Sequence, residues 1–591
     1  MWPQTYTPLL HSLGWSSLGA AIPMLVLLFL LAVLRKPSWL SALISLGTAI
    51  TVAFFLYHMP PARIVAAATY GAAFGLLPIG WITFNSILLY RLTVETGQFE
   101  VIKATLTGLT SDRRLQALLI AFAFGAFIEG AAGSGVPVAV GAAMLAGLGF
   151  SPLRAAQICL LANTAPVAFG AIGTPMVTLT AVTGLPILSL STWAGRLCAP
   201  LSLCIPTYLT AIVGGRKGVR GTLPAALLCG VSFATVQFLV SWKIGPQLTD
   251  VLASLVALAC LVALLRVWKP KDAGFNCSER MGANAAESRQ MAASAAAASV
   301  TVEGSAGLQA GCSGGVHARA AGSFGTDGVL APAIGPTPVP HRSGAEVLRA
   351  WMPYALLAVC VLLWGWPPVR NILDHAGPKW LWPGLHNQIL RMPPVVTAPT
   401  PYAAVYKFDW LVSPGTACLL ASILASLMAG LSPRRFGRVW LSTLRQMLFP
   451  LITIASVVSL AFVMNYCGAT ATLGLAFAAT GRFFPFFSPL LGWMGVFLTG
   501  SDASSNALFG NLQVVSANRL GLSPVLMAAA NSSGGVMGKM ISVQTIAVAT
   551  AATGMKASQE AQLLRFTFWR SFALASMIGL LTVVYAYTIA R

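Results

Sequence analysis

Residues 125–175 decide how the chain folds, and they read GAFIEGAAGSGVPVAVGAAMLAGLGFSPLRAAQICLLANTAPVAFGAIGTP. This apolar, glycine-rich run carries one carboxylate, Glu129, followed by a Gly/Ser/Pro break and then by Asn163 and Thr164. Lipid cannot satisfy a freed backbone N–H or C=O, so polar groups and broken helices at membrane depth must face protein or a water-filled cavity. The segment therefore predicts a buried site within a membrane protein.

The composition around this segment has the same character. Of 591 residues, 57% are hydrophobic and only 9% are charged, whereas about a quarter are charged in soluble proteins. Apolar windows of roughly 20 residues, long enough to cross about 30 Å of hydrocarbon, recur along the chain. We predict an all-α polytopic membrane protein with about 12 transmembrane helices and two re-entrant hairpins. Arg35 and Lys36 follow the first window, which indicates an uncleaved span with the N-terminus outside.

The formal charge of +21 does not indicate nucleic-acid binding. Lys and Arg lie in short gaps between apolar windows, where they act as topology signals for cytoplasmic loops, and no continuous basic face is predicted. The ten cysteines form no CxxC pair, and the six histidines lie at window edges or in loops. We therefore expect no metal site and no cofactor.

Residues 267–346 form one long polar interruption, rich in Ala, Gly and Ser. This composition cannot bury a core, and it predicts a disordered cytoplasmic linker. The linker would separate two membrane halves, residues 1–266 and 347–591, each with one hairpin. The basic clusters fall on one side in this arrangement and both termini on the other. Residues 367–410 fit less well, because they are placed outside although they hold several basic residues.

The opening segment has a counterpart at residues 495–542, GVFLTGSDASSNALFGNLQVVSANRLGLSPVLMAAANSSGGVMGKMIS. In this alignment Gly130 matches Gly500, Pro152 matches Pro524 and, after a shift, Asn163 matches Asn531. Flanking basic residues indicate that the two copies enter the membrane from opposite sides. Inverted repeats with paired, interrupted helices are typical of secondary transporters, whose sites lie at the repeat interface. Chance similarity among 56 glycines remains the alternative.

Of the fifteen acidic residues, Glu129 and Asp502 lie inside apolar windows, whereas Asp250 is interpreted as lying at a span edge. A carboxylate at that depth costs about 2.5 to 3.5 kcal/mol unless it is protonated, paired or hydrated. We predict that Glu129 and Asp502 bind protons or line the substrate site, and that they lie near each other. A helix-capping or ion-pairing role is the alternative. Lys539, the only deep lysine, would attract an anionic substrate or neutralise Asp502.

Hydroxyls and amides surround these charges, enough to bind a small hydroxylated anion, although each alone is more often a helix-packing contact. Half-helix N-termini near residues 130–135 and 501–506 would also favour an anion. The predicted substrate-binding residues are Lys539, Asn163, Thr164, Ser134, Ser501, Ser504, Ser505, Asn506, Asn531, Ser532 and Ser533. The predicted hairpin glycines are Gly130, Gly133, Gly135 and Gly500.

Several long motifs resemble the L-lactate permease family of bacterial transporters. They are GAFIEGAAG, LGFSPLRAA, NTAPVAFGAIG, RMPPVV, YAAVYKFDW, FFSPLLGWMGVFLTGSDASSNALF and GKMIS. The resemblance runs from Trp2 to the last span and leaves out the central linker. It implies a multi-pass permease of the bacterial inner membrane that takes up L-lactate, D-lactate and glycolate with protons. The chain departs from the family pattern at Ser134, where a phenylalanine is expected, which puts the substrate preference in doubt.

Together these observations predict a proton-coupled monocarboxylate symporter. Glu129 or Asp502 would take the proton, while Lys539 and the Ser/Asn cluster would hold the anion. A symporter of another small organic anion coupled to Na⁺ is the alternative, and a passive channel is a further one. An enzyme is not expected, because the membrane windows contain no DxxD, HExxH or GxSxG motif.

Overall fold

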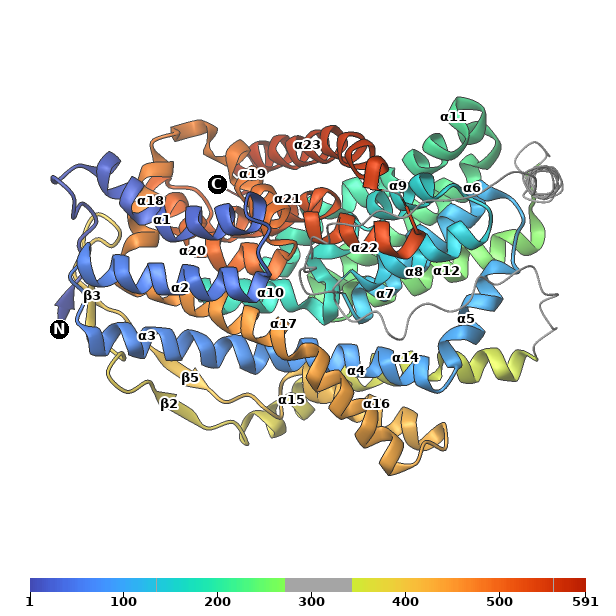
Figure 1. The fold of residues 1–591 in the computed structure, drawn as a ribbon, viewed down its shortest axis with the longest axis horizontal. Helices are drawn as coiled ribbons and strands as arrows, with labels where there is room; N and C mark the ends of the chain where they lie inside the picture. Colours follow the sequence, from blue (N-terminus) through green and yellow to red (C-terminus); the bar gives the residue numbers. More distant parts are fainter. Residues whose placement is uncertain (134, 271–342, 556, 591) are drawn as a thin grey trace, which may run out of the picture.

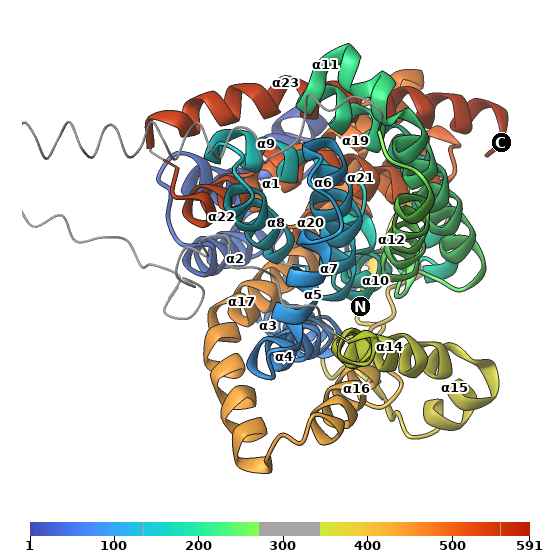
Figure 2. The same cartoon turned by 90° about the vertical axis from the view of Figure 1, so that its right-hand side faces the viewer.

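The computed structural model describes residues 1–133, 135–270, 343–555 and 557–590. Ser134 and most of the predicted linker lie outside these ranges. Long helices from both ends of the chain run side by side in one bundle, where α2 and α3 near the N-terminus pack on α17 and α1 packs on α18 (Figure 1). Seen end-on, α7, α10 and α20 lie near the middle of the bundle (Figure 2).

The first half consists of helices joined by short turns. They are α1 (Leu13–Ala32), α2 (Ser38–Phe55), α3 (Pro61–Phe74), η1 (Gly75–Gly80), α4 (Trp81–Glu95), α5 (Gln98–Thr107), α6 (Arg113–Gln116), η2 (Ala117–Phe124), α7 (Gly125–Ala131), α8 (Val136–Gly147), α9 (Pro152–Ala162), η3 (Val167–Phe169), α10 (Gly170–Thr183), α11 (Ile187–Lys243) and α12 (Thr249–Val267).

The second half is also mainly helical. Its helices are α14 (Gly344–Gly365), α15 (Pro367–Asp374), α16 (Pro414–Met428), α17 (Pro433–Cys467), α18 (Ala469–Ala478), η5 (Gly481–Phe483), α19 (Phe484–Thr499), α20 (Asp502–Leu520), α21 (Pro524–Gly538), η6 (Lys539–Ile541), α22 (Val543–Thr553) and α23 (Ala557–Thr588). Several begin with proline, whose missing N–H costs nothing at a helix start. Serine side chains cap others, as Ser432 does for α17 and Ser523 for α21.

The prediction of a polytopic helical membrane protein is confirmed. Within the described ranges, nine helices are long and apolar enough to cross a membrane, or up to eleven if each of two bent pairs is one span. The bent pairs are α9 with α10, at 64°, and α21 with α22, at 41°. The 57-residue helix α11 breaks at Gly215 and doubles back. Its two arms lie against each other, as the hydrogen bond from Ser202 to Gln237 shows. The exact number of spans stays a prediction.

The two halves share an order of elements. In each, two helices meet at a glycine turn, α7 and α8 at Gly133 and Gly135, and α19 and α20 at Gly500. All three glycines have positive φ, which disfavours any other residue there. In each half the next helix begins at a proline, Pro152 or Pro524, and belongs to a bent pair.

The all-α prediction was incomplete, because the structure contains five short strands: β1 (Trp2–Pro3), β2 (Lys379–Leu381), β3 (Ile389–Arg391), β4 (Thr400–Pro401) and β5 (Val405–Lys407). β1 pairs in parallel with β3, β3 pairs antiparallel with β4, and β2 pairs antiparallel with β5. We name residues 367–410 the cap. Their prolines and aromatic residues favour extended chain over helix. The sequence interpretation treated this segment only as an outer loop.

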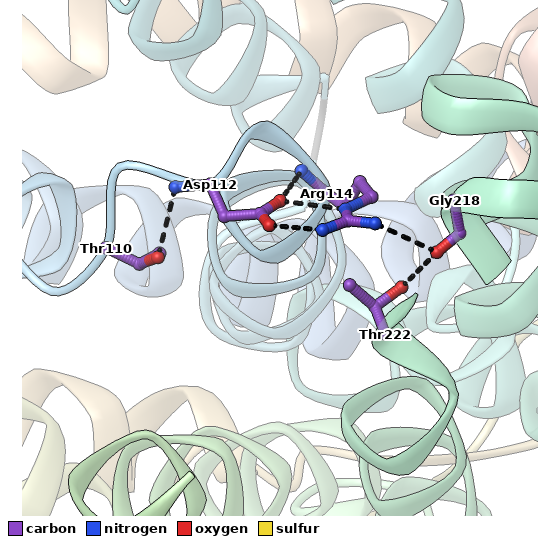
Figure 3. Close-up of polar contacts among 5 residues, drawn as sticks. All are labelled: Thr110, Asp112, Arg114, Gly218 and Thr222. Atoms are coloured by element: carbon purple, nitrogen blue, oxygen red, sulfur yellow. Dashed lines mark hydrogen bonds and ion pairs between the residues drawn. The ribbon is translucent and has the colours of Figure 1, made fainter. Parts of the chain in front are cut away.

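One buried ion pair holds the start of the first hairpin against α11 (Figure 3). Arg114 is fully buried, its Nη2 lies 2.6 Å from Asp112 Oδ2, and its Nε donates to Asp112 Oδ1. The guanidinium also reaches the Gly218 carbonyl, which accepts a hydrogen bond from Thr222. These contacts anchor α6, which follows the short helix α5.

Candidate functional site

A buried ion pair joins the two halves at the centre of the bundle. Lys539 Nζ lies 2.5 Å from Glu129 Oε1, and the side chains are 9% and 2% exposed. Glu129 lies in the last turn of α7, whereas Lys539 begins η6 at the bend between α21 and α22. The sequence interpretation allowed Lys539 to neutralise Asp502, but its direct partner is Glu129.

The backbone beside Glu129 is unwound. Ala171, Ile172 and Gly173 all have positive φ, so regular helix starts only after them. Gly170 lets this stretch approach the carboxylate, since a Cβ there would lie 2.8 Å from Glu129 Oε1. The break between α9 and α10 therefore lies directly against the ion pair.

Asp502 occupies the first turn of α20, where the helix dipole favours a negative charge. Its Oδ2 accepts hydrogen bonds from Ser532 Oγ at 2.5 Å and Asn506 Nδ2 at 3.5 Å. Gly535 passes close by, because a Cβ there would lie 2.3 Å from Asp502 Oδ1. Lys539 is near enough to interact electrostatically with Asp502, although its ion pair is with Glu129.

An amide network extends from Asp502 into both halves. Asn506 Nδ2 donates to the Pro175 carbonyl of α10 at 3.1 Å. Asn531 Nδ2 donates to Asn506 Oδ1 at 3.0 Å, and Gln513 Nε2 donates to Asn531 Oδ1 at 3.1 Å. These side chains are buried, and their hydrogen bonds hold α10, α20 and α21 together.

Asp250 is a third buried carboxylate, and it lies in the first turn of α12, at the edge of a candidate span as predicted. It is 1% exposed, and its Oδ1 accepts a hydrogen bond from Gln237 Nε2 at 3.1 Å. A Cβ on Gly130 would lie 3.2 Å from the Asp250 Cβ, which places Asp250 beside the residue that follows Glu129. Its burial was not predicted, because it comes from the packing of α12 on α7. The single acidic residue at the start of that apolar window was the available signal.

The remaining predicted residues divide into two groups. Several hydroxyls bond to nearby backbone: Thr164 to Leu161, Ser505 to Gly492, Ser533 to Ala529, while Ser501 caps α20 by accepting from the Ser504 amide. Asn163 differs, because it is 4% exposed and neither amide atom has a hydrogen-bond partner in the described structure. An unsatisfied buried amide costs about 1 to 3 kcal/mol, so Asn163 is the stronger ligand candidate.

The three carboxylates share this incomplete bonding. Glu129 Oε2, Asp250 Oδ2 and Asp502 Oδ1 are buried without a hydrogen-bond partner among the described residues. Lys539 is the one cation found paired with any of them in the described part of the chain. Such an arrangement can bind protons, or rearrange when an anion reaches Lys539. The described ranges contain no group of three His, Cys, Asp or Glu side chains placed to hold a metal.

The buried charges lie apart from the cavity that the structure shows near the N-terminal residues. A cavity of about 690 Å³ is found elsewhere, between the N-terminal residues, the Pro393–Pro394 turn and Arg519. None of the three carboxylates, Lys539 or Asn163 lines it. The charged cluster is thus held within the bundle, away from this cavity.

Membrane-length helices around a buried, incompletely neutralised charge cluster define a multi-pass membrane protein of the permease type. The sequence model of the family described as L-lactate permease matches residues 16–589. The chain is 43% identical to the L-lactate permease of Bacillus subtilis, covering 98% of both chains. It is also 43% identical to the glycolate permease GlcA of Escherichia coli, covering 99% of this chain and 98% of that one. The chain belongs to the L-lactate permease family.

Among solved structures, the chain is similar to MtrF of Neisseria gonorrhoeae, a protein described as illuminating a class of antimetabolite efflux pumps. The two share 12% identity, and the match covers 89% of this chain and 84% of that one with a TM-score of 0.44. This likeness is too distant to support an argument about site or mechanism.

Proposed function

We propose that this protein takes up L-lactate, together with D-lactate and glycolate, by proton symport across the bacterial inner membrane. The substrate class rests on family membership and on relatives named for lactate and for glycolate. The observation that carries the site assignment is the Lys539–Glu129 pair, in which the carboxylate holds the place a substrate carboxylate would take.

The proposed binding step is an exchange of partners. The incoming carboxylate displaces Glu129 from Lys539, and Asn163 supplies its unpartnered amide to the substrate. Ser532, Asn506 and Asn531 lie around Asp502 and serve the substrate hydroxyl, whereas Thr164, Ser501, Ser504, Ser505 and Ser533 shape the helix ends. Ser134 belongs to the first hairpin in this proposal and is not described by the structure.

Charge balance supports proton coupling. The described part of the bundle buries three carboxylates but pairs only Glu129 with a lysine, so bringing in an anion increases an uncompensated negative charge. Burying such charge costs several kcal/mol per ion, which protonation avoids. Glu129, once released, and Asp502 are the proposed proton acceptors. Neutralising them makes the loaded carrier easier to reorient.

The proposed transport cycle uses two inverted halves. About 12 spans and two re-entrant hairpins would form residues 1–266 and 347–591, joined by a cytoplasmic linker at 267–346. The shared order of a glycine-turn hairpin followed by a bent helix pair supports this repeat. Rocking of one half against the other would open the buried site alternately to each side.

Uptake of labelled lactate into membrane vesicles, with and without an imposed inward proton gradient, tests the proposal. We expect accumulation only with the gradient, and competition by glycolate and not by acetate, which lacks the hydroxyl. Pyruvate serves as a further competitor to test the need for that hydroxyl. Uptake that persists without a proton gradient but requires Na⁺ would replace this proposal with sodium coupling.

A further inference from the structure

Asp250 lies in a polar chain separate from the Glu129–Lys539 pair. Gln237 Nε2 donates to Asp250 Oδ1 at 3.1 Å and to the Ala165 carbonyl at 3.1 Å. Gln237 Oε1 accepts from Ser202 Oγ at 2.8 Å. The glutamine is thus fixed in orientation, with its amide nitrogen toward the carboxylate. Ala165 lies in the break after α9, two residues from Asn163, so this chain is attached to the unwound part of the bundle.

The surroundings of Asp250 favour its neutral form. The side chain is 1% exposed, and Oδ2 has no hydrogen-bond partner among the described residues. No cation is paired with it in the described structure, whereas Glu129 on α7 is near enough to interact electrostatically. On α11 the facing ionisable group is Cys198, and η2 and α10, the other elements packed against α12, carry no ionisable side chain.

A purely structural role explains the carboxylate at Asp250 less well than a proton-binding role does. A carboxylate in the first turn of α12 benefits from the helix dipole. That benefit is typically 0.3 to 1 kcal/mol at exposed positions, less than the cost of burying an unpaired carboxylate. An asparagine would accept the same Gln237 hydrogen bond without that cost. A buried carboxyl with one fixed donor and one unpartnered oxygen is suited to exchanging a proton.

We propose that Asp250 carries a coupled proton, at a site formed with Gln237 and separate from the Glu129–Lys539 pair. This inference rests on the proton-coupled transport proposed above. Oδ2 takes a proton from water entering from the side of higher proton concentration, which converts the carboxylate to a carboxylic acid. After reorientation the O–H bond breaks and the proton leaves to water on the other side. Gln237 stays bonded to Oδ1 throughout.

The test compares the wild type with Asp250→Asn and a control, Asp374→Asn in the cap, all as full-length protein in proteoliposomes. Exchange of labelled for unlabelled lactate at equal pH on both sides needs no net proton movement. We expect Asp250→Asn to retain this exchange within about threefold and to lose at least tenfold in accumulation driven by a proton gradient. The control should retain both activities.

Each result distinguishes the two proposals. Gradient-driven accumulation by Asp250→Asn at the wild-type level, with wild type driven by protons, would overturn the role of Asp250 alone. A wild type that does not respond to the gradient would overturn proton symport and this inference together. If Asp250→Asn is not recovered in the membrane, Gln237→Leu provides the measurement. This variant removes the Gln237 donor that stabilises the Asp250 carboxylate. The decline of lactate uptake at alkaline pH should therefore move to higher pH, and an unchanged dependence of uptake on pH would overturn the proposal.

Discussion

Lys539 Nζ, from the second half of the chain, lies 2.5 Å from Glu129 Oε1, from the first half, and both side chains are buried. A pair of this kind holds the two halves together while it is intact. It is also where an anion can bind, because the ammonium can donate hydrogen bonds to any carboxylate that reaches it.

Replacing one residue of this pair should destabilise the protein more than replacing both. Glu129→Gln or Lys539→Gln leaves a buried charge without its partner, at a cost of about 3 to 5 kcal/mol. We expect a lower Tm for each single variant, recovery of Tm in the double variant, and loss of lactate uptake in all three. Thermal unfolding in detergent and labelled-lactate uptake measure these outcomes.

The exposed pair Lys103–Glu100 provides the control, since its lysine and glutamate side chains are 23% and 50% exposed. Lys103→Gln should change stability by about 0 to 1 kcal/mol and leave uptake unaltered. Single variants at the buried pair that were as stable as Lys103→Gln would contradict its proposed role.

The amide network should show energetic coupling between α20 and α21. Asn506→Ala removes the donor to Pro175 and the acceptor of Asn531, leaving buried groups unsatisfied at about 1 to 3 kcal/mol each. In a double-mutant cycle, Asn506→Ala and Asn531→Ala should be non-additive by about 0.5 to 3 kcal/mol. Asn506→Ala combined with Ser422→Ala, whose hydroxyl bonds to its own helix, should be additive. Equal additivity in both pairs would rule out the coupling.

Close packing between α19 and α21 should leave no room for a methyl group at their contact. A Cβ on Gly534 would lie 2.0 Å from the Pro489 carbonyl oxygen, so α19 and α21 touch through backbone. We expect Gly534→Ala to lower stability by about 1 to 3 kcal/mol. Gly47 in α2 is the matched control, because nothing lies within 4 Å of its Cβ position. Gly47→Ala should be neutral or slightly stabilising, and a similar loss in both variants would argue against the close contact.

The cap should be most stable in a defined pH window. The hydrogen bond from Lys407 holds the pKa of Asp374 below its usual value, so that stabilisation exists above about pH 4 and is lost as pH falls through the lowered pKa. Burial lowers the pKa of Lys407, but its bonds to Asp374 and Asp409 outweigh that effect and raise it. The lysine contribution therefore persists below about pH 10.5 and is lost as pH rises through the raised pKa. Burial raises the pKa of Asp409, so its ionisation partly offsets the gain at neutral pH.

Hydrogen exchange of the paired strands β2 and β5 measures this window. We expect lower protection factors, meaning exchange rates corrected for the intrinsic rate at each pH, below about pH 4. Lys407→Met should lower the protection factors at any pH within the window. Lys103→Gln is the control, because Lys103 lies outside the cap and pairs with Glu100. A cap whose protection did not depend on Lys407 would show that the strands alone hold it.

The sequence predicted the elements that follow from chain-local physics. Apolar windows indicated membrane helices, and the breaks after Gly130, Asn163 and Gly500 occur where glycine and proline interrupt them. Partners depend on packing between distant segments, which no local pattern specifies. Lys539 was therefore assigned no definite partner, the buried partner of Asp250 was not foreseen, and the strand pairing in the cap was missed. Ser533 and Thr164 have the right residue types, but their hydroxyls bond to backbone.

The pairing of β1 with β3 affects the order in which the protein can be completed. Trp2 and Pro3 align with Ile389 and Leu390, and Gln4 donates to the carbonyls of Asn465 and Tyr466. β1 therefore waits for partners that are made hundreds of residues later. Until then β1 has no strand to pair with, so its attachment must follow synthesis of part of the second half. A fusion placed before Met1 would be held at this late-forming junction, whereas one placed after the final helix would not.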